Sequence, residues 1–261
     1  MSKRGVVRFD AKGPAAGDLE IWPEIPAASI ESGEPVQRGH LYVNEPLIGL
    51  SAGIWDCTPF IGVMETYPVT EFMLLLEGSL TIIEPSGKST VIKAGESFIL
   101  PKGLICKWHQ PDYVRKFFVI LDNSKIPAEQ GDKLRVIKLD HGLVPQSVTA
   151  SPPADILIGT VPQQRGEDVF VDASGQLSIG IWDTTSYHRI PVPFPRYELM
   201  HFLDGSVSMT IAPEAGDAAQ RHLFQAGDTM FITKGTKADF KVESDYLRKI
   251  YVIFIPAAPA N

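Results

Sequence analysis

Short apolar runs separated by turn-forming residues extend along most of the chain. LTIIEP (80–85), STVIKA (89–94), ESFILP (96–101) and KFFVIL (116–121) are rich in β-branched and aromatic side chains. Gly, Pro or Asp residues lie between such runs, and no stretch shows a long helical period with start and stop signals. Short strands at a spacing of about 8–12 residues predict an antiparallel β-sandwich or β-barrel.

The strand pattern occurs twice. GIWDCTPF (53–60) recurs as GIWDTTSY (180–187), and LEGSLTI (76–82) recurs as LDGSVSM (203–209), both at an offset of 127 residues. Further along, the offset grows to 132 residues, and the extra residues are expected in the loop 213–220. Repeats of this kind predict two domains of similar fold.

The repeat includes the segments that precede each set of strands. VVRFD (6–10) resembles VIKLD (136–140), so each repeat is expected to carry a lead-in arm. Both arms contain many Pro and Gly residues, and we expect them to be extended and to add edge strands. The predicted domains are residues 1–127, with an N-terminal arm, and residues 128–261, with a linker arm.

Composition narrows the range of partners. The chain has 261 residues, of which 44% are hydrophobic, enough for a sizeable core. Its net charge of −7, with no cluster of Lys and Arg, argues against a nucleic-acid partner. No apolar run approaches the roughly 18 residues that a membrane span needs. The first residues lack the apolar stretch of a secretory signal, so we expect a cytoplasmic location.

Two spaced motifs occur in each repeat. E-x6-G is present at Glu71–Gly78 and Glu198–Gly205, and G-x5-P-x-G is present at Gly95–Gly103. The second repeat keeps the glycines of the latter motif, at Gly227–Gly235, without the proline. With these motifs the chain resembles the cupin superfamily. That resemblance implies an all-β fold of two tandem cupin (jelly-roll β-barrel) domains that arose by internal duplication.

Finer features are similar to one subgroup of cupins. The G-x-W-D segments, Trp108 and an Arg-Lys pair on the last strand of each repeat resemble cupins related to (S)-ureidoglycine aminohydrolase and to ethanolamine-utilisation proteins. The resemblance implies small nitrogenous or carboxylated metabolites as ligands, and frequent homodimers. It also implies manganese in one of the two barrels for the aminohydrolase itself.

The first repeat departs from the histidine-rich metal motif of cupins. The four positions that the resemblance assigns to metal ligands are Glu65, Tyr67, Glu71 and Cys106. Carboxylates suit Mn or Mg, whereas a thiolate prefers Zn or Fe, and no histidine is available. A metal is therefore not favoured; if Mn, Fe or Zn binds, these four residues are its expected ligands.

The second repeat offers still fewer donors. Val192, Phe194 and Ala238 occupy three of the four positions and leave Glu198 alone. We therefore expect the first barrel to carry any activity and the second, with the poorer lumen, to be a structural or interface partner. Asp56 and Asp183, in the two G-I-W-D segments, are expected in strand-end turns rather than in a catalytic pair.

Both lumens are expected to contain a Glu and a Lys among aromatic side chains. Such a pair could fix a zwitterion or another polar metabolite in an apolar cavity. Glu71 is the candidate catalytic acid/base. The predicted ligand-binding residues are Trp55, Glu65, Tyr67, Cys106, Trp108, Lys116, Glu198 and Lys249.

Three functions remain open at this point. The chain could be an enzyme of small-metabolite metabolism that uses Glu71 in the first barrel. It could also be a metal-free ligand-binding or sensing module without catalysis. In the third case both barrels are structural, and each Glu–Lys pair is an internal bridge. The expected partners are a small molecule and a second copy of the chain in a homodimer.

Overall fold

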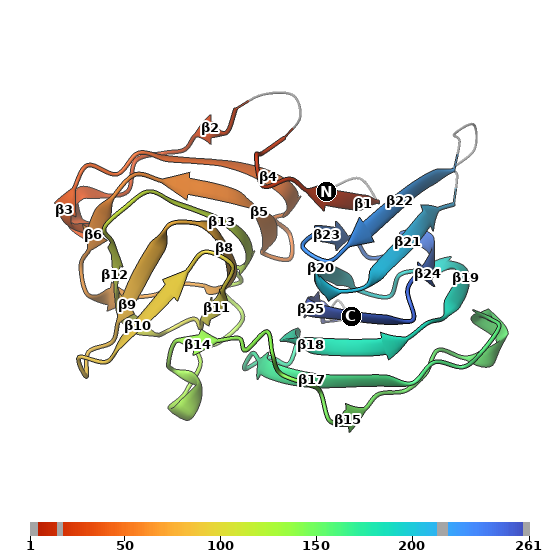
Figure 1. The fold of residues 1–261 in the computed structure, drawn as a ribbon. Coiled ribbons are helices and arrows are strands. Elements are labelled where there is room, and N and C mark those ends of the chain that lie inside the picture. Colours follow the sequence, from red (N-terminus) through yellow and green to blue (C-terminus); the bar gives the residue numbers. More distant parts are fainter. Residues whose placement is uncertain (1–4, 15–17, 213–218, 258–261) are drawn as a thin grey trace. The chain divides into compact units, whose positions relative to one another are not determined.

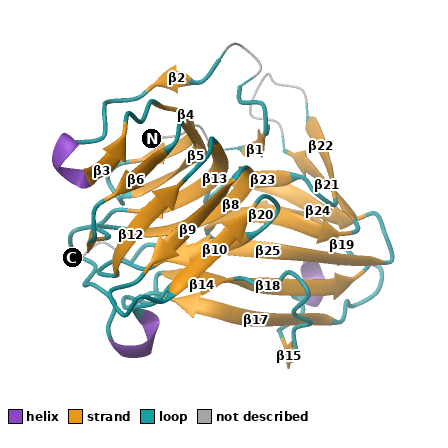
Figure 2. Ribbon diagram, turned by 60° about the vertical axis from the view of Figure 1, so that its left-hand side comes forward, coloured by secondary structure: helices purple, strands orange, loops and turns teal. Residues whose placement is uncertain are grey.

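The computed structural model describes residues 5–14, 18–212 and 219–257. Nearly all of the regular structure is strand, and the helical parts are the short 3-10 turns η1 (Ala27–Ser29), η2 (Gly131–Lys133) and η3 (Ala154–Ile156) (Figure 2). None of the helices in these described ranges has the length and apolar character needed to cross a bilayer. Most of the loop 213–220, where the inserted residues are expected, lies outside the described residues.

The chain divides into two compact units. The first comprises the described part of 9–139 and Asp172–Ser174. The second comprises residues 5–8, Asp140–Val171 and the described part of 175–261. The predicted all-β fold of two tandem jelly-roll barrels is confirmed. The units are defined by contacts in space and the predicted boundary at residue 127 by sequence repeats, so that boundary stays a prediction.

The first unit contains two antiparallel sheets (Figure 1). In spatial order, one sheet consists of β14 (Ile137–Lys138), β11 (Ser97–Leu100), β8 (Thr70–Glu77), β13 (Val114–Leu121), β5 (Leu50–Cys57), β4 (Gln37–Glu45) and β2 (Glu20–Ile21). The other consists of β10 (Ser89–Lys93), β9 (Ser79–Ile83), β12 (Ile105–Gln110), β6 (Phe60–Gly62) and β3 (Ile30–Gly33), with β7 (Glu65–Thr66) also paired to β12. Inward side chains of both sheets, such as Met73 and Ile82, form one core.

The second unit repeats this plan. One sheet consists of β1 (Val6–Phe9), β23 (Thr229–Ile232), β20 (Tyr197–Asp204), β25 (Tyr246–Phe254), β18 (Leu177–Thr185), β17 (Gln164–Val171) and β15 (Ser147–Val148). The other consists of β16 (Leu157–Ile158), β19 (His188–Pro193), β24 (Lys237–Val242), β21 (Ser206–Ile211) and β22 (Gln220–Gln225). The two units therefore have the same strand order, as the internal repeat predicts.

The lead-in arms add edge strands, as expected. β2 pairs with β4 in the first unit, and β15 pairs with β17 in the second at the equivalent register. The similar segments that form β1 and β14 occupy matching edges, next to β23 and β11. An arm strand at the edge matters for the site, because it brings the residues that follow it over the barrel.

The glycine that ends each E-x6-G motif has a steric reason. Gly78 and Gly205 have φ of 79° and 78°, in the left-handed region that favours glycine. A Cβ atom would lie 2.0 Å from the carbonyl oxygen of Tyr113 at the first position and 2.1 Å from that of Tyr246 at the second. The motif therefore marks a tight strand turn after β8 and β20.

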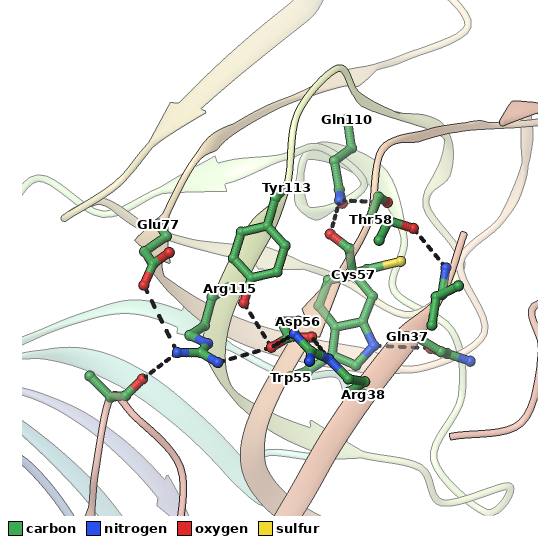
Figure 3. A network of polar contacts seen from close by, with 12 residues as sticks. Gln37, Arg38, Trp55, Asp56, Cys57, Thr58, Glu77, Gln110, Tyr113 and Arg115 are labelled. Carbon is green, nitrogen blue, oxygen red and sulfur yellow. Dashed lines mark hydrogen bonds and ion pairs between the residues drawn. The ribbon is translucent and has the colours of Figure 1, made fainter. Parts of the chain in front are cut away.

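Asp56 and Asp183 lie within strands and not in strand-end turns, so that expectation is wrong. Asp56 on β5 is buried and accepts hydrogen bonds from Arg38 Nε at 2.9 Å, Arg115 Nη2 at 3.0 Å and the Tyr113 hydroxyl at 2.7 Å (Figure 3). In the second unit, Arg165 and Tyr246 bond Asp183 in the same way. Each aspartate thus joins neighbouring strands of its sheet.

Candidate functional site

A buried ion pair lies in the first barrel. Glu71 on β8 and Lys116 on β13 are both almost fully buried, and Lys116 Nζ lies 2.7 Å from Glu71 Oε1. The Tyr67 hydroxyl donates a hydrogen bond to the other carboxylate oxygen, Oε2. Both oxygens of Glu71 are therefore engaged by neighbours in the barrel, which is how a buried charge is retained.

Aromatic rings surround the ammonium group. Lys116 Nζ lies 4.8 Å from the ring centroid of Trp55 and 5.2 Å from that of Trp108, within the range of cation–π attraction. The indole Nε1 of Trp55 donates to Gln37 at 2.9 Å, and that of Trp108 donates to Gln110 at 3.0 Å. These bonds fix the rings, so the cation has a rigid aromatic wall.

A cavity of about 200 Å³ adjoins this pair. Its lining includes six of the predicted ligand-binding residues, namely Trp55, Glu65, Tyr67, Cys106, Trp108 and Lys116. Glu71 does not line the cavity but lies behind Lys116 and Tyr67. The carboxylate of Glu71 is therefore connected to this cavity through the side chains of Lys116 and Tyr67.

The four candidate metal ligands do not form a suitable donor set. Burial raises the pKa of Cys106 to about 12, so its thiol stays protonated. Glu65 is exposed and accepts a hydrogen bond from Ser29 Oγ at 3.1 Å, while Glu71 is held by Lys116 and Tyr67. Among the described residues, no group of three or more His, Cys, Asp or Glu side chains is placed to hold an ion. These donors do not fit a divalent metal.

The second barrel has the same pair with a different third member. Lys249 Nζ lies 2.7 Å from Glu198 Oε1, and Arg196 Nε lies 2.9 Å from Glu198 Oε2. Burial alone would raise the pKa of Glu198, but the two cations lower it. Lys249 lies 4.8 Å from the ring centroid of Trp182, as Lys116 does from Trp55. A guanidinium thus replaces the Tyr67 hydroxyl at the second carboxylate oxygen.

Sequence reasoning missed Arg189 and Arg196. Arg189 is on β19, and its Nε and Nη2 atoms are buried without a hydrogen-bond partner among the described residues. Its Cζ atom lies 5.1 Å from the ring centroid of Phe194, and burial lowers its pKa. At the repeat offset of 127, Gly62 and Val69 stand opposite the two arginines. The sequence signal that could have identified them is the replacement of a small or apolar residue in the first repeat by an arginine in the second.

The second lumen is much the larger. Its cavity has a volume of about 980 Å³, and Glu198, Lys249, Arg189 and Arg196 all line it. Its remaining lining includes Trp182, Tyr187, Phe194, Phe240 and Tyr251, together with arm residues between Gln146 and Ile156. We expected the second lumen to be the poorer in polar groups. That expectation is wrong, because four charged side chains line the second cavity.

One equivalent position in the two arms holds a large side chain in the first barrel and a small one in the second. The backbone N–H of Trp22 bonds the Gln37 carbonyl at 3.0 Å, and that of Thr149 bonds the Gln164 carbonyl at 3.0 Å, so the two residues are equivalent. The Trp22 ring lies so close to Gly39 that a Cβ there would be 2.4 Å from it. It also packs on Phe118 of the first core, with ring centroids 6.0 Å apart. Thr149 instead lines the second cavity.

Comparisons with known proteins agree with this architecture. A protein of unknown function from Pseudomonas syringae pathovar tomato has a TM-score of 0.76 and 25% identity, covering 96% of this chain and 100% of that one. A glyoxylate-induced protein from Pseudomonas aeruginosa has a TM-score of 0.56 and 12% identity, covering 100% and 92%. A cupin 2 conserved barrel domain protein from Leptotrichia buccalis has a TM-score of 0.54 and 11% identity, covering 91% and 98%.

Family membership follows from the sequence model that matches. Comparison with curated proteins gives no significant match. The model of the EutQ-like cupin domain matches residues 45–118 and again residues 171–251, together more than half of the chain. The first match includes Glu71 and the second includes Glu198. The chain therefore belongs to the family of EutQ-like cupin domains and carries two copies of that domain.

Proposed function

We propose that this bicupin binds a small polar metabolite in the lumen of its second barrel. The observation that carries the proposal is the cavity of about 980 Å³ lined by Glu198, Lys249, Arg189 and Arg196. Its size suits a small-molecule site, and a few convergent polar groups among aromatic rings are typical of one. The first barrel, with about 200 Å³ and Trp22 packed on its core, leaves far less room.

The chemistry of the lining supports the ligand class that the family resemblance implies, nitrogenous or carboxylated metabolites. Arginine and lysine side chains bind carboxylates, whereas the carboxylate of Glu198 is already paired. We favour binding without turnover. In both Glu–Lys pairs the carboxylate and the ammonium group are bonded to each other, so neither is free to act as an acid or a base.

Filling the cavity tests the proposal. Thr149→Trp places in the second barrel the side chain that stands at the equivalent position of the first, and we expect it to abolish ligand binding. The measurement is a thermal-shift screen of the full chain against ureides, amino acids and keto acids. Val148→Trp is the matched control, since Val148 precedes Thr149 in the same arm but is 85% exposed. Shifts that survive Thr149→Trp would place the ligand elsewhere.

A second candidate function is an enzyme in the first barrel. The observation in its favour is the hydrogen-bonded chain Tyr67–Glu71–Lys116, whose two ends line a cavity. Lys116 and Tyr67 would touch the substrate, and Glu71 would exchange protons with them as the acid/base. Turnover of a nitrogenous or carboxylated compound, lost in Glu71→Gln with substrate binding retained, would support an enzyme over a binding module.

Neither proposal depends on a metal or on a known oligomeric state. Manganese, iron or zinc present in a one-to-one ratio in purified protein, and lost in Glu71→Gln, would contradict the metal-free site. The homodimer that the resemblance implies remains a proposal, which light scattering after size-exclusion chromatography tests directly. A cytoplasmic location likewise stays a prediction.

A further inference from the structure

We infer that Arg189 is the anchor for a carboxylate group of the ligand in the second barrel. This inference rests on the proposed function of that lumen and adds the chemical class that the lumen selects, a small carboxylic acid. The observation behind it is a buried guanidinium edge, Nε and Nη2, that faces no hydrogen-bond acceptor among the described residues.

The same edge binds carboxylates elsewhere in this protein. Arg38 uses Nε and Nη2 to hold the two oxygens of Asp56 at 2.9 and 3.1 Å. Arg165 does the same with Asp183 at 3.0 and 2.8 Å. A guanidinium presents these two donors in a fork that matches the two oxygens of a carboxylate. Arg189 offers this fork in a cavity, with no side-chain carboxylate in it.

No carboxylate contacts the Nε and Nη2 atoms of Arg189 in the described part of the chain, and Glu198 and Asp239 act on its charge only from a distance. Arg196 and Lys249 already share the single charge of Glu198. The other lining carboxylates are Glu167 and Asp168, and Asp168 accepts a hydrogen bond from the Tyr251 hydroxyl at 2.7 Å. Neither makes an ion pair with Arg189 in the described part of the chain. An anion that enters the lumen would therefore find two buried guanidinium donors that no described residue engages in a hydrogen bond.

A tyrosine beside the arginine can add a donor. Tyr187 also lines the cavity, and burial raises its pKa to about 12, so its hydroxyl keeps its proton at neutral pH. A hydroxyl donor and a guanidinium fork suit one carboxylate with two acceptor oxygens. The guanidinium itself lies over the ring of Phe194, with Cζ 5.1 Å from the ring centroid.

The fold does not require this arginine. The first barrel has the same strand order with Gly62 at the equivalent position of β6. A buried guanidinium without a partner costs free energy, so a purely structural role would be better served by a smaller or apolar residue. Arg189 therefore fits a group that is kept for binding at some expense of stability.

The test compares carboxylates with neutral amides of the same shape. Acetate, malonate and succinate are titrated into the full chain, and acetamide, malonamide and succinamide serve as uncharged probes. Affinity is measured by calorimetry, and the Nε–H signal of Arg189 is followed by NMR. The variants are Arg189→Met, Arg189→Lys and, as a control for net charge, Arg221→Gln, since Arg221 is on the surface.

The expected result has three parts. At least one carboxylate binds and shifts the Arg189 signal, while its amide binds much more weakly. Arg189→Met lowers that affinity on the order of 100-fold, Arg189→Lys lowers it less, and Arg221→Gln changes it by less than about twofold. Without ligand, Arg189→Met unfolds at a temperature higher by about 2 °C or more, because the unpaired charge is gone.

Two results would overturn the inference in distinguishable ways. If amides and carboxylates bind equally well, and Arg189→Met binds as the wild type does, the lumen binds a ligand but Arg189 does not anchor a carboxylate. If no carboxylate and no amide binds, and the metabolite screen is also negative, both the inference and the proposed function of the second barrel fail.

Discussion

The two barrels keep one ion pair and differ in what stands next to it. Glu71–Lys116 and Glu198–Lys249 have the same 2.7 Å separation, each beside a tryptophan. In the first barrel a neutral hydroxyl bonds the second carboxylate oxygen, and in the second barrel a guanidinium does so. The shared pair therefore belongs to the framework, while the residues around it set the charge of each lumen.

The two lumens also differ at a residue outside the repeated motifs. Trp22 packs on the first core, and Thr149, its counterpart in the second arm, leaves a cavity. The duplicated barrels thus have cavities of about 200 and 980 Å³, and their arms differ beside them. The comparison teaches that motif positions alone do not identify the copy with the larger lumen.

The largest expected effect comes from removing the shared carboxylate. Glu198→Gln leaves the buried Lys249 and the partly exposed Arg196 without a counter-charge, whereas Glu71→Gln leaves only the buried Lys116 without one. Breaking a buried pair by loss of one partner costs about 3–5 kcal/mol, and we expect Glu198→Gln to lie at the upper end. Thermal unfolding of the full chain measures the effect, with exposed Glu77→Gln as the control. Equal losses of stability in Glu198→Gln and Glu71→Gln would contradict this prediction and show that the loss of the counter-charge of Arg196 has no measurable cost.

Opening the first barrel should cost less. Trp22→Thr gives the first arm the residue of the second and removes an indole that packs on Phe118 and over Gly39. Loss of a packed tryptophan costs about 3 kcal/mol, reduced here because the ring is only partly buried. Urea unfolding measures the loss. A variant as stable as the wild type would show that Trp22 is not part of the first core.

The smallest expected effect concerns acid stability and is confined to the second barrel. His201 on β20 stands at the position of Leu74 in the first repeat, and its Nδ1 lies 2.9 Å from Thr229 Oγ1. Burial first, and then nearby His141, lower its pKa to about 4, while Asp228 opposes this shift. The folded state therefore keeps His201 neutral at pH values where the unfolded chain protonates it.

The sign of the pH dependence follows. An unfolded histidine has a pKa of about 6.5, so stability from this residue is complete above that pH and falls as the pH drops toward 4. His201→Leu should remove this part of the fall, on the order of 2 kcal/mol. The measurement is the free energy of unfolding of both proteins between pH 7 and pH 4. Parallel curves would mean that His201 is not held neutral by the fold.

The sequence was sufficient for the fold because the fold depends on local and repeated signals. Alternating strand patterns, the turn glycines Gly78 and Gly205, and the duplication all act through backbone geometry and periodicity. The pairing of a Glu with a Lys in each lumen was also predictable, since the Glu and the Lys stand at equivalent positions of the two repeats. Each of these features is visible without knowledge of packing.

The rest of the site depends on differences between the repeats. Arg189 and Arg196 do not follow from the polar residues that the two repeats share, because their counterparts are Gly62 and Val69. The contrast between Trp22 and Thr149 was missed because an arm with many Pro and Gly residues carries no periodic pattern that places it over a barrel. Cavity volume is a property of three-dimensional packing, which periodicity does not encode.

The stoichiometry of ligand binding tests the central claim most directly. Calorimetric titration of the full chain with a ligand found in the metabolite screen should give one bound molecule per chain. Thr149→Trp should abolish that binding, and Val148→Trp should leave it unchanged. Two molecules bound per chain, or one that still binds to Thr149→Trp, would contradict the assignment of the ligand site to the second barrel.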